Sequence, residues 1–155
     1  MMPTTTTTLE VEDRLVELFD AATSAPVTFA WPGPASQSTC VFLGLHPEVR
    51  DVLLDLSSED PVIKAGRRQS QEEYRIICTI WVFRPDLDSA GARKCAGTAH
   101  DIYDDLYDVL VNDSKLGLSS IQWARPAGFE RRMYPFQKGW ACDFRFFIDV
   151  QARIT

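Results

Sequence analysis

The chain has 155 residues, of which 45% are hydrophobic and 25% are charged, and its formal net charge is −6. These proportions are those of an ordinary globular domain and exclude the disordered, collagen-like and coiled-coil classes. The acidic balance argues against a general nucleic-acid-binding surface, and no segment approaches the ~20 consecutive apolar residues of a membrane-spanning helix.

The first eight residues are polar and rich in threonine. They contain neither the basic region nor the apolar region of a signal peptide. Because such a segment has little apolar surface to bury, we predict a disordered tail at residues 1–8. We therefore expect synthesis in the cytoplasm without a secretion step, and a single folded domain over residues 9–155.

A helix is predicted from Thr8 to about Ala22. Apolar residues recur there at helical spacing from Val11 onward, which gives the segment one apolar face. Thr7 and Glu10 have the spacing of a capping box, in which the threonine caps the helix and the glutamate reaches back to it. The helix is therefore expected to begin immediately after Thr7.

Short apolar segments follow this helix. Residues 27–31 and 39–45 predict two strands, and the Pro-Gly-Pro sequence at residues 32–34 predicts a turn after the first of them. The apolar spacing in residues 46–56 fits a helical turn and a short strand equally well, and residues 57–61 are predicted to form a loop. The state of residues 46–56 therefore stays open.

Residues 62–83 predict a long β-hairpin that projects from the domain. Its arms are residues 62–67 and 72–83, and its bend lies near residues 68–71. In the second arm one alternating face is uniformly apolar and the other is mixed, which is typical of a sheet with one side on the core. Two arginines at the tip have little of their own chain to pair with. We therefore expect residues 67–70 to contact another protein chain.

A second, long helix is predicted from Ser89 to about Asn112. Acidic residues crowd its second half and basic residues its first turns, so both placements oppose the helix dipole. A basic partner would relieve that cost, which indicates a protein interface; a solvated face and a hard-cation site are the alternatives. His100 and Asp104 stand four residues apart, and we interpret them as a solvated pair. The acidic face consists of Asp101, Asp104, Asp105 and Asp108.

The last part of the chain predicts two more strands. Residues 119–126, resuming at 129–134, form the first, and residues 140–154 form the second. In the second, apolar and charged residues alternate, with Phe147 as the one apolar residue on the charged face. The whole order of elements predicts an α+β fold: a mainly antiparallel β-sheet with two α-helices packed on one face.

The sequence contains no arrangement typical of catalysis or metal binding. The G-x-S-x-G, Walker A and G-x-G-x-x-G motifs do not occur, and no local histidine and acid combination would activate a nucleophile. No cysteine belongs to a C-x-x-C pair, so we interpret all four as buried, reduced thiols. We therefore expect a protein that is not an enzyme and has no cofactor and no metal. The cysteines are Cys40, Cys78, Cys95 and Cys142.

Basic and aromatic residues interleave in the region that precedes the last strand. Such a pattern can form a platform for nucleic acid, a protein-contact patch, or solvent-exposed side chains at a sheet edge that bind nothing. In an acidic protein we interpret it as a protein-contact patch. The residues are Trp123, Arg125, Phe129, Arg131, Arg132, Tyr134, Phe136 and Lys138.

Several segments taken together resemble one family. The first helix reads V-E-D-R-L-V-E-L-F at residues 11–19, and A-W-P-G-P follows at 30–34. The hairpin reads I-K-A-G-R-R-Q-S-Q-E-E-Y at 63–74, the acidic helix D-I-Y-D-D-L at 101–106, and the last strand ends V-Q-A-R-I at 150–154. This arrangement resembles the tail terminator, or tail completion, proteins of long-tailed phages, particularly those infecting actinobacteria. The likeness covers nearly the whole chain and is strongest in the hairpin.

The resemblance implies a non-enzymatic α+β subunit that assembles as a hexameric ring in the virion. The ring would cap the head-proximal end of the tail tube, end its polymerisation and present a surface to the head connector. Its partners would be itself, the tube protein and the connector, with DNA passing through the ring without specific binding. Assembly would occur in the host cytoplasm.

Two other classes of function remain open. The first is another phage neck component, such as a head-completion or minor tail protein; the second is a small ligand-binding or enzymatic α+β domain. For self-association we expect the mixed face of the hairpin arm and last strand to contribute, because aromatic groups stand there among charges. The predicted contact residues are Arg67, Arg68, Gln69, Ser70, Trp81, Asp101, Asp104, Asp105, Asp108, Arg131, Arg132, Tyr134, Phe136 and Phe147.

Overall fold

The computed structural model describes residues 6–33, 39–45, 56–58, 62–63 and 70–154. Two helices and seven strands occur in this part of the chain. In chain order they are α1 (Thr8–Ala22), β1 (Val27–Thr28), β2 (Thr39–Leu43), β3 (Leu56–Ser58), β4 (Val62–Ile63), β5 (Ser70–Arg84), α2 (Ser89–Asn112), β6 (Ile121–Phe136) and β7 (Gly139–Ile154).

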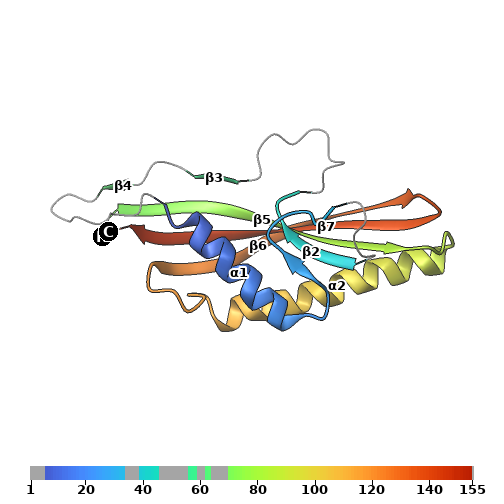
Figure 1. Ribbon diagram of the computed structural model, residues 1–155, viewed down its shortest axis with the longest axis horizontal. Coiled ribbons are helices and arrows are strands. Elements are labelled where there is room, and N and C mark those ends of the chain that lie inside the picture. The colour runs from blue at the N-terminus through green and yellow to red at the C-terminus, as the bar shows by residue number, and fades with distance from the viewer. Residues whose placement is uncertain (1–5, 34–38, 46–55, 59–61, 64–69, 155) are drawn as a thin grey trace.

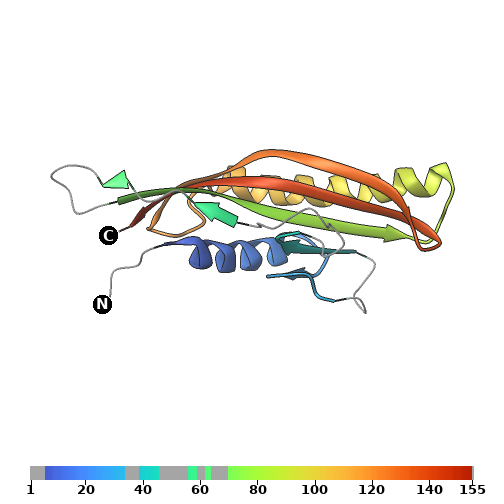
Figure 2. The same ribbon diagram turned by 90° about the horizontal axis from the view of Figure 1, so that it is seen from above.

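The strands form one elongated sheet, and β5, β6 and β7 run along most of its length (Figure 1). The strand order is β1-β2-β5-β7-β6, and β3 and β4 pair with β5 beyond the end of β2. Among the described strands only β1 and β2 pair in parallel; the other pairs are antiparallel. Seen from above, β1 and β2 lie at one edge of the sheet and β6 at the other (Figure 2).

Both helices pack on the same face of this sheet. The buried residues of α1, such as Leu15 and Phe19, and those of α2, such as Leu106, join a single apolar core. The core continues into the alternate residues of β5 and β7, where the Phe146 ring lies 6.0 Å from the Phe19 ring. The prediction of an α+β fold, with a mainly antiparallel sheet and two helices on one face, is confirmed.

The two helices begin and end where the sequence predicted, but α1 is not held by a capping box. Thr7 makes no side-chain cap hydrogen bond. Its hydroxyl lies 2.9 Å from the Tyr74 hydroxyl, and the buried Glu72 carboxylate accepts a hydrogen bond from the Thr7 amide at 3.2 Å. The start of α1 is therefore fixed by β5, a contact across 65 residues that local spacing does not reveal. At α2, the Asp88 carboxylate accepts a hydrogen bond from the Gly91 amide at 2.6 Å.

The strand boundaries differ from the predicted ones at three places. β1 and β2 are shorter than predicted, and β3 includes Ser57 and Ser58, which were predicted to lie in a loop. The hairpin of β4 and β5 pairs Val62 with Gln71 and Ile63 with Ser70, so Ser70 and Gln71, which were predicted at the bend, belong to a paired strand. Residues 64–69 lie outside the described part of the chain, as do residues 1–5 of the predicted tail, whereas Thr7 of that tail is buried and Thr8 begins α1.

β6 is one strand where an interrupted one was predicted. Its register against β7 shifts between Pro126 and Phe129, which marks a β-bulge. Gly128 sits at this bulge with φ +102°, a conformation that glycine adopts at no steric cost. The glycine therefore bends the strand without ending it, and β6 continues to Phe136.

Candidate protein-contact surfaces

The predicted acidic face of α2 lies on the outside of the molecule. Asp101, Asp104, Asp105 and Asp108 are all exposed, on the side of the helix that points away from the core. None of the three ion pairs found among the described residues involves them. The face therefore presents carboxylates that no basic group of the described chain neutralises.

Two of these aspartates border a groove beside α2. The opposite wall is the connection between α1 and β1, and the start of β2 closes one side. Hydroxyl groups and carboxylates dominate the polar lining, so the groove suits a cationic group. Sequence reasoning missed it, because its walls come from segments about 75 positions apart. The lining residues are Thr23, Ser24, Ala25, Pro26, Thr39, Thr98, Asp101, Ile102 and Asp105.

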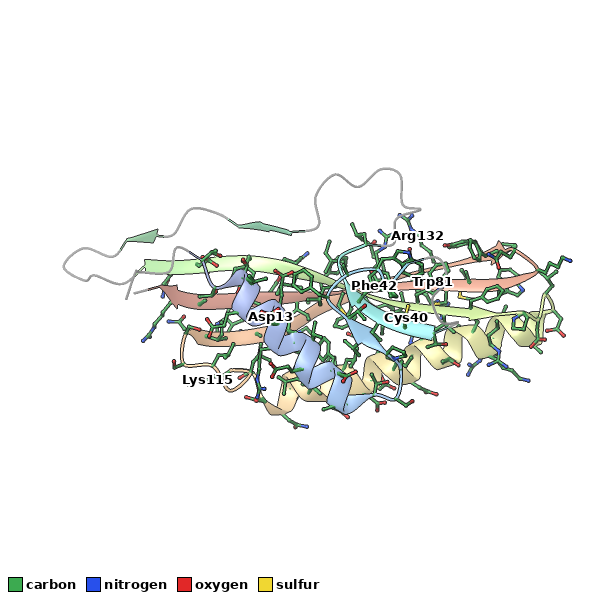
Figure 3. All side chains as sticks on the ribbon, in the orientation of Figure 1. Asp13, Cys40, Phe42, Trp81, Lys115 and Arg132 are labelled. Atoms are coloured by element: carbon green, nitrogen blue, oxygen red, sulfur yellow. The ribbon has the colours of Figure 1, made fainter. Side chains whose placement is uncertain are left out.

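Arg131 and Arg132 lie on β6 at the opposite edge of the sheet, and both are exposed. Because successive strand residues face opposite sides, Arg131 lies on the helix side and Arg132 on the other side (Figure 3). Nη1 of Arg131 is 3.0 Å from Nε2 of His100. His100 thus approaches this arginine and not Asp104, the predicted partner in a solvated pair.

Arg132 lies across from Asp143 of β7 in the strand register. The Asp143 carboxylate, however, is bound by Arg145, whose Nη2 lies 3.0 Å from Oδ2. Among the described residues, no hydrogen bond or ion pair joins the Arg132 guanidinium to another side chain. Arg132 is therefore an exposed cation whose nearest acid across the strands is already paired.

Trp81 does not lie on a contact surface, contrary to the prediction. It is 3% exposed and belongs to a second apolar cluster on the face of the sheet opposite the helices (Figure 3). Its ring lies 6.1 Å from Trp31 and 5.5 Å from Phe136. Tyr134 packs at the border of the same cluster, 6.2 Å from Trp81. This end of the sheet is thus buried on both faces, which turns Trp81 into an interior residue and leaves Tyr134 and Phe136 half-buried.

Phe147 lies on the mixed face, as the alternation of β7 predicted, and is half-buried. The Arg75 guanidinium stands over its ring at 5.3 Å and donates a hydrogen bond from Nε to Asp149 Oδ1 at 2.8 Å. This end of the mixed face is therefore a partly exposed combination of aromatic and charged groups. Such a composition is typical of protein interfaces.

The predicted contacts at the hairpin bend fall mostly outside the described residues. Arg67, Arg68 and Gln69 lie there, so their role stays a prediction. Ser70 is described as the first residue of β5, where it pairs with Ile63 and with Ile154. It belongs to the sheet and not to the bend.

The described residues contain no cluster of three or more His, Cys, Asp or Glu side chains that could hold a metal ion. All four cysteines are free and buried. Burial raises the pKa of the Cys40 thiol to about 11 and that of Cys142 to about 12. It also raises the pKa of Cys78 and Cys95. Because the thiolate is the reactive form, these groups are suited to packing and not to nucleophilic attack.

Comparison of the sequence with models of known protein families and with curated proteins finds no match. Within the described residues, neither helix has the length and apolar character needed to cross a membrane. The evidence for a function therefore comes from the resemblance of the sequence segments, the fold and the surfaces described above.

Proposed function

We propose that this protein is a structural virion protein that caps the head-proximal end of a phage tail tube. It assembles there as a ring, most simply a hexamer that matches a sixfold tube. The ring ends tube polymerisation and offers its other side to the head connector. The protein has no enzymatic activity in this role and uses no cofactor.

The observation that carries this proposal is the placement of opposite charges on two different sides of one subunit. Carboxylates line the groove near β1 and β2, whereas Arg131 and Arg132 lie on β6. Two different complementary surfaces on one subunit favour head-to-tail contacts, which close into a ring when the rotation between subunits allows it. Exposed arginines and half-buried aromatic groups along β6 also suit contacts with other proteins.

The chemistry of the interior is consistent with a structural role. Buried protonated thiols and the lack of a metal-ligand cluster in the described part provide no reactive centre. The resemblance of the first helix, hairpin, acidic helix and last strand to tail terminators supplies the biological setting. In that setting the partners are the tube protein, the connector and further copies of this chain.

The proposal is tested by adding the purified protein to growing tail tubes of the phage that encodes it. We expect elongation to stop, and gold-labelled protein to mark one end of each tube. Labelling along the tube or at the distal tip contradicts the proposal. Binding to the portal end of the head without binding to tubes favours a head-completion protein.

A further inference from the structure

We infer that copies of this chain associate head to tail, with Arg132 on β6 of one copy entering the groove beside α2 of the next. This contact would serve as the subunit contact of the ring and takes its biological setting from the proposed function. Its chemical basis is independent of that setting, because it depends only on the surfaces of this chain.

The groove offers the acceptors that a guanidinium requires. Asp101 and Asp105 stand four residues apart on α2, so one turn of helix places both carboxylates on the same wall. The hydroxyls of Ser24 and Thr39 contribute further acceptors from the other sides. A planar guanidinium has five N–H donors and can bind carboxylates in a bidentate manner. An arginine therefore matches the groove better than a lysine does.

The edge strand offers a suitable arginine. Arg132 is exposed, and the acid across from it in the register, Asp143, is paired with Arg145. Among the described strands β6 pairs only with β7, so its outer edge is open to another chain. Phe129, 48% exposed on the helix side of the same strand, adds exposed apolar surface to this edge of the sheet. Arginine and aromatic residues are the groups most enriched in protein interfaces.

The position of the two surfaces determines the kind of assembly. The groove adjoins the β1–β2 side of the sheet, and Arg132 lies on β6. These strands are at opposite edges of the sheet (Figure 2). A molecule cannot satisfy its own groove with its own arginine across the width of the sheet. Each contact therefore leaves one groove and one arginine free for further copies, which is the property of a heterologous interface.

The test uses two charge reversals, Arg132→Glu at the edge and Asp105→Lys in the groove. Sedimentation equilibrium of the purified full chain is measured at low and high salt. At ~25 mM salt we expect the wild type to self-associate and each variant to do so roughly tenfold more weakly, because like charges would then meet at the contact. An equimolar mixture of the two variants should associate about as strongly as the wild type, since it restores complementary pairs.

Two further variants serve as matched controls. Lys115→Glu and Asp13→Lys make the same changes of charge at exposed positions away from the groove and from Arg132 (Figure 3). Both should associate as the wild type does. Far-UV circular dichroism verifies that all four variants are folded.

Three results overturn the inference. These are a wild type that stays monomeric at ~1 mM in low salt, reversals that weaken association no more than the controls, and a mixture that remains as weak as its components. None of them decides where the protein sits on the tail. Conversely, a location away from the head-proximal tube end contradicts the proposed function and leaves the contact standing.

Discussion

Arg145 binds Asp143, two positions earlier on β7, with Nη2 3.0 Å from Oδ2, and both side chains are buried. The same face of the sheet carries a second ion pair, in which Nε of Arg75 lies 2.8 Å from Asp149 Oδ1. In that pair 54% of the arginine side chain and 39% of the aspartate side chain are exposed. Two pairs of the same chemistry thus differ mainly in burial, which makes each the control for the other.

We predict that Asp143→Ala lowers the free energy of unfolding by about 3–5 kcal/mol, because it leaves a buried arginine without its counter-charge. Asp149→Ala should lower it by less than about 1 kcal/mol, because water screens the exposed pair. Urea denaturation of both variants measures the difference.

A double variant separates the cost of the orphaned charge from the value of the pair. Asp143→Leu combined with Arg145→Met replaces both charges by apolar groups and should be less destabilising than Asp143→Ala alone. If Asp143→Ala lowers the free energy of unfolding no more than Asp149→Ala does, the buried pair is no more important for stability than the exposed pair.

Two glycines of α2 should respond in opposite ways to alanine. At Gly97 an added Cβ would meet only the mobile end of the Arg93 side chain, at 2.7 Å. Gly97→Ala should therefore raise the free energy of unfolding by about 0.5–1 kcal/mol through helix propensity. At Gly91 the Cβ would lie 2.5 Å from the backbone oxygen of Asp86, so Gly91→Ala should destabilise the protein.

The shift in melting temperature of each glycine variant is the measurement. Opposite signs are expected, with both variants retaining the helical circular dichroism of the wild type. Equal destabilisation by the two alanines would contradict the packing described at the start of α2.

The thiols should be unreactive in the folded protein. At pH 8 we expect no cysteine of the native chain to react with Ellman's reagent, and four to react after unfolding in guanidinium, because all four are buried and their pKa values are raised. Rapid reaction of one or more thiols at native conditions would show that the described core is open at that position.

The same burial makes stability depend on alkaline pH. Cys40 has an ordinary pKa of 9.0 that burial raises to about 11 in the fold. Below pH 9 the thiol is protonated in both the folded and the unfolded chain, so its full contribution to the free energy of unfolding is present. From there upward the unfolded chain loses the proton first, so the free energy of unfolding falls, by about 1.4 kcal/mol per pH unit for each such thiol, until the folded thiol also ionises.

Urea denaturation at pH 8, 9.5 and 10.5 follows this loss. In Cys40→Ala the free energy of unfolding should fall less steeply between pH 9.5 and 10.5 than in the wild type, whatever the effect of the substitution on stability at pH 8. An unchanged slope would show that Cys40 does not titrate as its burial implies.

The parts of the fold that follow from local periodicity could be predicted from the sequence. Both helices and the inward face of β7 follow from spacing alone, because helical and strand periods differ. Periodicity assigns a residue to a face but does not tell what covers that face. The burial of Trp81 and of the Asp143–Arg145 pair was therefore missed.

Contacts between segments far apart in the sequence could not be predicted from it either. The groove beside α2 requires the connection after α1 to lie next to Asp101, and the start of α1 depends on Glu72. The continuation of β6 through Gly128 depends on a bulge that the sequence suggests only as a break. The acidic face of α2 and the arginines of β6 were predicted individually, but the position of the acidic groove on the β1–β2 side, away from β6, needed the strand order.

In the function proposed above, this chain forms a ring at the head-proximal end of a phage tail tube. The most direct measurement is a cryo-EM reconstruction of the intact tail of the phage that encodes it. We predict a single ring of this subunit between the last ring of tube protein and the head connector. A distribution along the tube, a position at the distal tip, or absence from the particle would contradict the proposed function.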